Sequence, residues 1–370
     1  LSWEITDLVQ KWYTDPSTNH GFVLKALNEE KGYKTWLYSS DYNGKYYARP
    51  FITITYRNMS GYEDYYSYTS LSSGRGGTAS VNNYNGNLVF TQPLTLDTGC
   101  NTMPVNLSLV YNNNGDANPF GFMGNRVQTN FHIYLRYDEA LAGNGFRYYL
   151  HDADGTKHWF YFENDSNVGK DEDGLGYTLE YLDKTVAPYA EFLITDKNKN
   201  KMYFDEWGWL LKIENSNNVA ITLEYETYED HFRIKSITDG IGRKYLFGYH
   251  EYYHNSIINF TDPVGRVTYI YTDANNNLSS VCFPDGKSIY LNYGSNGLLS
   301  EIYDIDGNKT TISYHNSVQK QVYEFAWGKP ENVLDYYNFI YKQNATEITD
   351  SQGRKFTYQF NDWGQNTSVV

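Results

Sequence analysis

The stretch that decides the fold reads Thr261-Asp262-Pro263-Val264-Gly265-Arg266. Its T-D-x-x-G-R pattern recurs at Thr238–Arg243 and Thr349–Arg354, and a relaxed copy lies at Tyr303–Lys309. The Asp spacings are 262 − 239 = 23, 304 − 262 = 42 and 350 − 304 = 46, which is one period followed by two periods twice. Aspartate accepts hydrogen bonds from the backbone of its own turn, and glycine tolerates a positive φ, so each copy predicts a tight turn.

The residues that define these turns are expected to have a structural role. They are Asp239, Gly242, Arg243, Asp262, Gly265, Arg266, Asp304, Gly307, Asp350, Gly353 and Arg354.

Tyrosines mark the ends of the repeating units. They fall at positions 225, 249, 271, 293 and 314, in steps of 24, 22, 22 and 21. A period of 20–25 residues without helical spacing indicates an array of β units, each with two strands and two turns, that bury their faces against their neighbours. We expect these tyrosine rings to pack between strands.

The composition fits an all-β chain. Its 370 residues include 39 Tyr, 30 Gly and only 9 Pro, and we count 38 Asn. Tyrosine favours strands, and Asn and Gly favour tight turns. The formal net charge is 30 − 44 = −14, which disfavours nucleic acid as a partner. No stretch approaches 18 consecutive apolar residues, so no membrane span is predicted.

Three regions follow from the patterns along the chain. Residues 1–60 contain a helical pattern at Ile5, Leu8, Val9 and Trp12, with Thr6 as its cap, and strand-like runs at 21–26 and 49–56. Residues 61–200 predict irregular strands, a flexible linker at Ser72–Thr78, and a hairpin that turns on Asp154-Gly155. Residues 201–370 contain the repeats.

The repeat resembles the Rhs or YD repeat of bacterial polymorphic toxins and animal teneurins. That resemblance implies a spiralling antiparallel β-sheet, an open fragment of a hollow β-shell, with residues 61–200 as its opening segment. It also implies a partner: a C-terminal toxin domain of the same parent chain, enclosed by the shell and delivered in competition between cells. An open adhesive stalk, teneurin-like in use, stays as the alternative.

Residues 1–60 resemble the C-terminal part of a DNRLRE-type β-sandwich, a domain linked to carbohydrate-binding modules. The resemblance rests on Trp3–Trp12, which reads W-E-I-T-x-L-V-Q-x-W, on Asn19–Ala26 and on Arg49-Pro50. Such a domain ahead of Rhs repeats implies a secreted, wall-associated or cell-surface bacterial protein. Polysaccharide is then a possible partner, and the alternative function is surface adhesion or carbohydrate binding.

Aromatic residues of this region are candidate platforms for sugar rings, or alternatively cover the core of the sandwich. They are Trp36, Tyr38, Tyr42, Tyr46 and Tyr47. The chain opens on Leu1 and closes inside a unit at Phe360–Gly364, so we expect a piece of a longer protein, truncated within the repeats.

Motifs for catalysis are weak. His250-Glu251-Tyr252-Tyr253-His254 spells the zincin signature H-E-x-x-H, but that motif needs a helix, and strand-like runs flank it here, so a hairpin is favoured. Asp152-Ala153-Asp154-Gly155 faintly resembles a calcium loop, yet its glycine is misplaced, and a hairpin turn is favoured. We therefore expect no catalytic residue, metal or cofactor, and no enzymatic activity.

Two cysteines, Cys100 and Cys282, cannot form a disulfide framework. Two buried free thiols are favoured over one long-range bridge.

Overall fold

The computed structural model describes residues 5, 8, 9, 11, 12, 16–23, 38, 39, 42, 61–95, 102–115, 123–139, 145–163, 166–183, 189–229, 231–251, 256–316, 320–329 and 331–370. The chain divides into two compact units, Leu1–Tyr56 and Arg57–Val370. No helix in the described part has the length and apolar character needed to cross a membrane.

The first unit contains helical backbone where the sequence predicts it. Leu8, Val9, Lys11 and Trp12 are helical, and the N–H of Val9 donates to the carbonyl of Ile5 at 3.0 Å. A short 3-10 turn, η1 (Pro16–Thr18), follows. Thr6, the expected cap, and the strand expected at 49–56 lie outside the described residues. Residues 21–23, which open the other expected strand, are not in a strand.

The second unit begins with a five-stranded antiparallel sheet, ordered β1-β2-β3-β4-β5. Its strands are β1 (Tyr68–Gly74), β2 (Gly77–Asn82), β3 (Leu88–Pro93), β4 (Ser108–Asn112) and β5 (Val127–Thr129). The linker predicted at Ser72–Thr78 is therefore wrong, because β1 and β2 form a hairpin there. Gly74, Arg75 and Gly76 all have positive φ, so the glycines that suggested flexibility instead permit a tight reversal.

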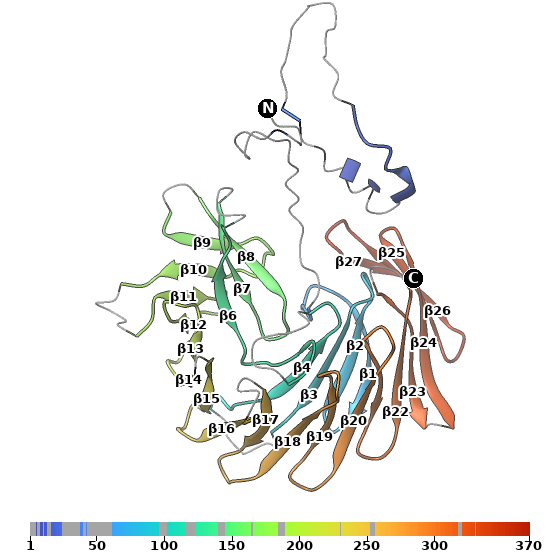
Figure 1. Ribbon diagram of the computed structural model, residues 1–370. Coiled ribbons are helices and arrows are strands. Elements are labelled where there is room, and N and C mark those ends of the chain that lie inside the picture. The colour runs from blue at the N-terminus through green and yellow to red at the C-terminus, as the bar shows by residue number, and fades with distance from the viewer. Residues whose placement is uncertain are drawn as a thin grey trace, which may run out of the picture. The chain divides into compact units, whose positions relative to one another are not determined.

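The remaining strands form one long antiparallel sheet in which each strand pairs with the next in the chain (Figure 1). The first ten are β6 (Tyr134–Tyr137), β7 (Phe146–His151), β8 (Lys157–Phe162), β9 (Val168–Asp171), β10 (Thr178–Tyr181), β11 (Phe192–Thr195), β12 (Lys201–Phe204), β13 (Leu210–Glu214), β14 (Ala220–Tyr228) and β15 (His231–Thr238). The next six are β16 (Lys244–Tyr249), β17 (Ile257–Thr261), β18 (Val267–Thr272), β19 (Leu278–Cys282), β20 (Ser288–Tyr293) and β21 (Leu299–Tyr303). The last six are β22 (Lys309–Tyr314), β23 (Val322–Lys329), β24 (Asn332–Lys342), β25 (Ala345–Asp350), β26 (Lys355–Phe360) and β27 (Asn366–Val369). The all-β antiparallel architecture expected from the repeats is confirmed.

The start of the long sheet bends back onto a later turn. Tyr134 of β6 forms an isolated bridge with Trp209, and the N–H of Leu135 donates to the carbonyl of Gly208 at 2.7 Å. The Arg136 guanidinium lies over the Tyr134 and Trp209 rings, 4.6 and 4.4 Å from their centres. This seam joins β6 to the turn before β13.

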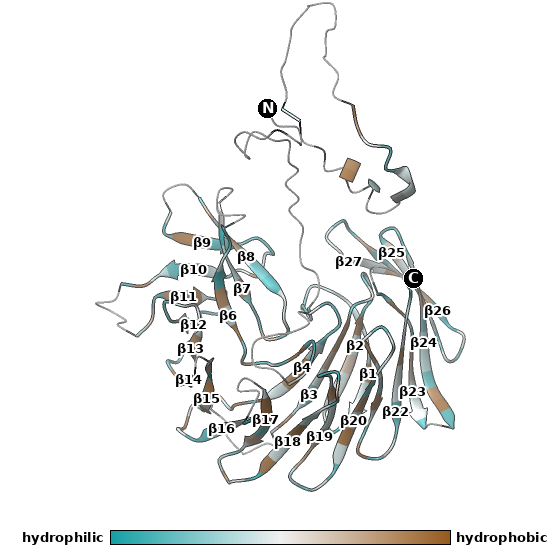
Figure 2. Ribbon diagram, in the orientation of Figure 1, coloured by the Kyte–Doolittle hydropathy of each residue, from teal (hydrophilic) through white to brown (hydrophobic). Residues whose placement is uncertain are grey.

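The two sheets of the second unit share one hydrophobic core. Strands alternate apolar and polar residues (Figure 2), as a half-buried sheet requires. Phe90 and Leu109 of the small sheet and Ile289 and Phe325 of the long sheet are fully buried in the same cluster. The small sheet therefore packs against the repeats through a shared core.

Hydrogen bonds connect the loops of the small sheet to the repeat turns. The N–H of Asn125 donates to the carbonyl of Asn276 at 2.8 Å, and the N–H of Val322 donates to the carbonyl of Gly86 at 3.0 Å. Arg75 forms an ion pair with Asp285 at 2.6 Å. The small sheet is thus held along its rim as well as through its core.

Three unit-ending tyrosines lock neighbouring strands together. The hydroxyls of Tyr225, Tyr249 and Tyr314 each donate to the carbonyl of the residue 15 positions earlier, at 2.8, 2.5 and 2.8 Å. Tyr271 differs, because half of its surface is exposed. Packing between strands is therefore confirmed for Tyr225, Tyr249 and Tyr314 and wrong for Tyr271. The Tyr293 ring also packs against the core, with its centre 6.3 Å from that of Tyr111.

Cys282 is a free, half-buried thiol, so it is less buried than predicted. Cys100 lies outside the described residues.

Candidate functional site: repeat turns and a buried histidine–carboxylate cluster

The repeat turn has a fixed hydrogen-bond pattern, shown by Asp262. Its N–H donates to the carbonyl of Arg266 at 2.9 Å, and the N–H of Gly265 donates back to its carbonyl at 2.9 Å. Its Oδ1 accepts from the N–H groups of Val264 and Arg266, and its Oδ2 accepts from Arg266 Nε at 2.6 Å. Gly265 has φ +85. This is a type I turn closed by a left-handed residue.

All eleven repeat-turn residues singled out in the sequence lie in four turns of this type. Arg243 and Arg354 donate to Asp239 and Asp350 as Arg266 does to Asp262, at 2.8 and 2.6 Å. Asn308 Nδ2 takes the place of the arginine beside Asp304, at 2.8 Å. The fourth position is Gly242, Gly307 or Gly353, each with positive φ.

The same backbone pattern occurs twelve times in the described part of the long sheet. The turns begin at Asp152, Asp196, Asp205, Asn215, Asp239, Asp262, Asp273, Phe283, Gly294, Asp304, Asp350 and Asn361. Ten of these first residues are Asp or Asn, whose side chains can accept the turn N–H groups. A single turn type thus closes hairpins over more than 200 residues.

The turn at Asp152, between β7 and β8, is the first of the twelve and confirms the predicted hairpin. Its Oδ1 accepts from the N–H groups of Asp154 and Thr156, at 3.1 and 3.0 Å, as in the repeats. Its Oδ2 has a different partner: it lies 3.1 Å from Nε2 of His158. The position of the arginine, four residues after the aspartate, is Thr156 here, and the oxygen is contacted instead by a buried histidine two residues further on.

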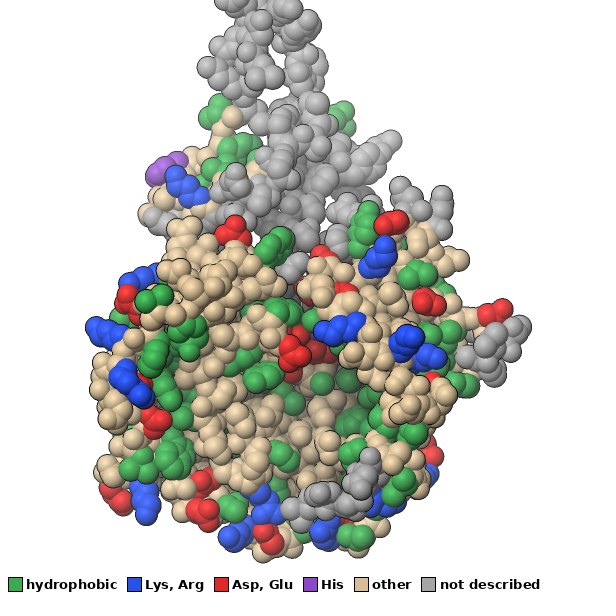
Figure 3. Space-filling view, turned by 180° about the vertical axis from the view of Figure 1, so that it is seen from behind, with side chains coloured by type: hydrophobic (Ala, Val, Ile, Leu, Met, Phe, Trp, Pro, Cys, Tyr) green, Lys and Arg blue, Asp and Glu red, His purple; other side chains and the backbone are tan. Residues whose placement is uncertain are grey.

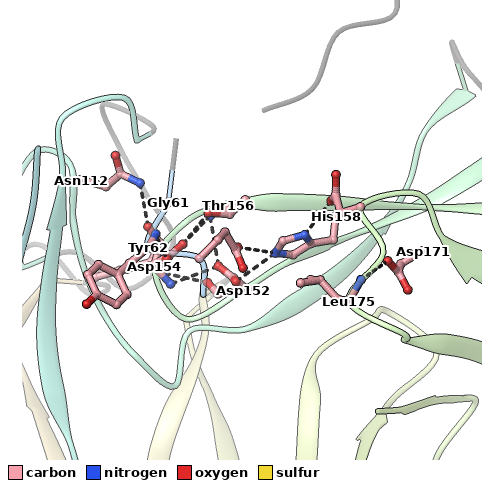
Figure 4. A network of polar contacts seen from close by, with 12 residues as sticks. Gly61, Tyr62, Asn112, Asp152, Asp154, Thr156, His158, Asp171 and Leu175 are labelled. Carbon is pink, nitrogen blue, oxygen red and sulfur yellow. Dashed lines mark hydrogen bonds and ion pairs between the residues drawn. The ribbon is translucent and has the colours of Figure 1, made fainter. Parts of the chain in front are cut away.

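Three carboxylates surround the His158 ring, whose side chain is 1% exposed. Nδ1 lies 2.8 Å from Asp173 Oδ2, and Nε2 lies 3.1 Å from both Asp152 Oδ2 and Glu63 Oε1. Figure 4 shows the imidazole pointing from β8 toward Asp152, with Asp154 close by. Glu63, Asp152, His158 and Asp173 are called the histidine–carboxylate cluster below.

The elements that carry these residues explain why they meet. On β8, alternation places His158, Phe160 and Phe162 on the buried face. Glu63 comes from the segment before β1, whose Gly61 lies so close to Asp154 and Thr156 that a Cβ there would overlap both side chains. The N–H of Tyr62 donates to Asp154 Oδ2, which holds that segment against the turn. Asp173 follows β9.

Burial and charge shift the protonation of the cluster. Burial lowers the pKa of His158, but the neighbouring carboxylates of Asp152, Asp173 and Glu63 outweigh it, so this pKa lies well above 6.5. Burial raises the pKa of Asp152, but His158 outweighs it, and the pKa lies below 3.8. Burial raises the pKa of Glu63, which His158 offsets only in part. Burial and the Asp152 charge raise the pKa of Asp154 well above 3.8.

Sequence reasoning missed Glu63, His158 and Asp173 as members of a site. Asp152 and Glu63 are 152 − 63 = 89 positions apart, and no motif joins them. The one available signal was a histidine at an inward position of an alternating strand.

The H-E-x-x-H segment lies in the β16–β17 hairpin, as favoured from the sequence. The N–H of His250 donates to the carbonyl of Ser256 at 2.8 Å, which closes the loop across it. Residues 252–255, including His254, lie outside the described residues.

The candidate sugar platforms are only partly described. The Tyr38 and Tyr42 rings pack with centres 4.2 Å apart, and Tyr38 is 53% exposed. Trp36, Tyr46 and Tyr47 lie outside the described residues.

No family model and no curated protein sequence matches the chain. Among solved structures, TcdB2-TccC3 is similar at 10% identity and a TM-score of 0.34, over 82% of this chain and 18% of that chain. A Photorhabdus luminescens Tc holotoxin pore is similar at 12% identity and a TM-score of 0.33, over 79% of this chain and 16% of that chain. The chain thus spans less than a fifth of the length of either.

Proposed function

We propose that the chain is a non-catalytic structural segment of a secreted Rhs/YD-repeat protein, wall-associated or exposed at the cell surface. In this proposal the long sheet forms part of a β-shell that encloses a C-terminal toxin domain of the parent chain and delivers it to competing cells.

The observation that carries the proposal is the long sheet itself, with twelve hairpins closed by one turn type. A sheet that grows strand by strand in chain order can be extended by further units without crossovers. Its twist makes it curve, and free edges occur only at its two ends. Such a sheet suits a wall around a cargo better than it suits a catalytic scaffold.

The surface of the second unit is compatible with a wall that stays in solvent. Figure 3 shows Lys and Arg interspersed with Asp and Glu around the periphery of one face, with hydrophobic side chains between them. Exposed apolar residues such as Tyr269, Tyr290 and Ile340 alternate with buried ones along their strands.

The test is protease access in the full-length parent protein. A specific protease site is placed in its C-terminal segment, and a control site is placed in the exposed turn at Ser295–Asn296. The carrier proposal expects rapid cleavage at the control site and protection of the C-terminal site until the protein is denatured.

Cryo-electron microscopy of the same protein should show density for the C-terminal segment inside the β-structure. Equal cleavage at both sites, with an exposed C-terminus, would contradict the carrier proposal. It would favour the adhesive stalk or carbohydrate-binding alternative, which glycan-array binding by the parent protein would then separate.

A further inference from the structure

We propose that Glu63, Asp152 and His158 bind a first-row divalent transition-metal ion, for which Zn²⁺ is the best fit, and that Asp173 orients the histidine. The site is independent of the proposed carrier function.

The ligand atoms already have the spacing of a coordination sphere. His158 Nε2 lies 3.1 Å from Glu63 Oε1 and 3.1 Å from Asp152 Oδ2, and the three atoms lie within 4.8 Å of one another. Zinc bonds to nitrogen and oxygen of about 2.0–2.2 Å give tetrahedral ligand separations of roughly 3.3 Å. The two separations from His158 Nε2 are therefore within a few tenths of an ångström of the tetrahedral value, and the third pair of ligand atoms lies within 4.8 Å.

Proton counting leaves one buried oxygen without a donor. A doubly protonated His158 has one N–H on each ring nitrogen: Nδ1–H points to Asp173, and Nε2–H can serve only one of its two neighbours. Asp152 Oδ2 accepts that hydrogen bond. Glu63 Oε1 lies equally close but accepts no hydrogen bond, although the residue is only 8% exposed. A cation in place of the Nε2 proton would contact both carboxylates at once.

The surroundings of the ligands match those of metal-binding histidines. Such a histidine donates its other ring N–H to a carboxylate, which fixes the tautomer and the ring orientation. Asp173 is in that position, 2.8 Å from Nδ1. Asp152 is held as well, because its Oδ1 accepts two N–H groups of its own turn. Two of the three ligands are thus oriented before any ion arrives.

The donor set selects among ions. One imidazole and two carboxylates suit Zn²⁺, or less well Mn²⁺, whereas Ca²⁺ takes 6–8 oxygen ligands. The ion would join the segment before β1 to the β7–β8 hairpin, with ligands 152 − 63 = 89 positions apart. Its role in this proposal is therefore to fasten the small sheet's leading segment to the long sheet.

The experiment uses the whole 370-residue chain after chelator treatment and desalting. Separate samples receive Zn²⁺, Mn²⁺ or Ca²⁺, are desalted again, and are analysed by elemental mass spectrometry and thermal melting. We expect one equivalent of retained Zn²⁺ with a higher Tm, weaker retention of Mn²⁺, and no retention of Ca²⁺. Failure to retain Zn²⁺, or preferential retention of Ca²⁺, would overturn the proposal.

Two variants locate the ion. Glu63→Gln removes a ligand charge but keeps the side-chain size, and we expect at least a tenfold loss of Zn²⁺ affinity with the chelator-treated Tm unchanged or raised. Asp173→Asn should lower the affinity about 10–100-fold, as loss of an orienting carboxylate does. His250→Ala, in the β16–β17 loop, is the control and should bind as the parent chain does. Retention unchanged in Glu63→Gln and Asp173→Asn, or lost in His250→Ala, would place the ion elsewhere.

Discussion

The turns at Asp262 and Asp152 share a backbone and differ in one partner. At Asp262 the second carboxylate oxygen accepts from Arg266, whose side chain is 36% exposed. At Asp152 the same oxygen meets His158, whose side chain is 1% exposed and has two further carboxylates around it. An identical turn therefore yields an ion pair of little energetic weight at the surface, and a set of strongly coupled charges in the interior.

Replacing the buried partner should have the largest effect. His158→Ala leaves the carboxylates of Asp152, Asp173 and Glu63 close together without the cation between them, and we expect a loss of about 3–5 kcal/mol in the free energy of unfolding. Urea unfolding followed by tryptophan fluorescence measures it. His315→Ala, at an exposed histidine, is the control and should change the stability by less than about 0.5 kcal/mol. Equal losses of unfolding free energy in His158→Ala and His315→Ala would mean that the histidine–carboxylate cluster does not stabilise the fold.

Two glycines of the same turn position separate backbone strain from steric overlap. Gly265 has φ +85 and open space around its missing Cβ, so Gly265→Ala should cost about 1–2 kcal/mol from the left-handed conformation alone. Gly208 has φ +79, and a Cβ there would lie 2.0 Å from the carbonyl oxygen of Leu135 at the β6 seam. Gly208→Ala should therefore cost about 1–3 kcal/mol more.

Thermal melting of the two variants side by side checks the difference. A Gly208→Ala protein no less stable than Gly265→Ala would show that the seam with β6 does not form.

Acid should weaken the repeat turns through their carboxylates. Burial opposes the charge of Asp239, but hydrogen bonds from the Arg243 backbone and side chain and from the Ile241 N–H outweigh it, so its pKa lies below 3.8. A lowered folded-state pKa gives stability that is present above pH 3.8 and lost as the pH falls through the folded value.

Asp239→Asn keeps an acceptor for the turn N–H groups but removes the charge. As the pH falls below about 4, the unfolding free energy of this variant should therefore decrease less than that of the parent chain. If the unfolding free energies of the two proteins fell equally with pH across that range, the lowered pKa of Asp239 would be contradicted.

The arginine of the turn should matter least. The Arg354 side chain is 69% exposed, and its contact with Asp350 is a surface ion pair. Arg354→Ala should change stability by less than about 0.5 kcal/mol, and 0.5 M salt should remove the difference. A larger, salt-independent loss would show that the guanidinium packs rather than pairs.

The turns could be predicted because their information is local. Asp262 and Gly265 lie three positions apart, and each acts on the backbone between them, so a single sequence reveals their geometry. The hairpin at Asp154-Gly155 was found for the same reason. The segment at Ser72–Thr78 shows the limit of such reasoning, since small polar residues and glycines suit both a flexible linker and a tight hairpin. Strand pairing on both sides decides between them.

The cluster could not be predicted because its members are brought together only by the fold. Glu63 and Asp173 are separated from His158 by loops and strands, and acidic residues are common in this chain. Tyr271 failed as a packing residue for a related reason: the register shift of its strand falls between Tyr271 and Thr272, so Thr272 takes the place that Tyr225 has in β14, and Tyr271 lies on the exposed face. The local sequence pattern predicts which strand or turn forms, whereas packing against neighbouring strands and loops determines which of its side chains are buried.

The five-stranded sheet has a consequence for the order of folding. Its loops bond to repeats far along the chain, as between Gln321 and Asn85, which are 236 positions apart. Contacts of such high sequence separation form slowly, because a long loop must close first. During synthesis β1–β5 emerge well before those repeats, so we expect their apolar face to serve as the template on which successive hairpins condense.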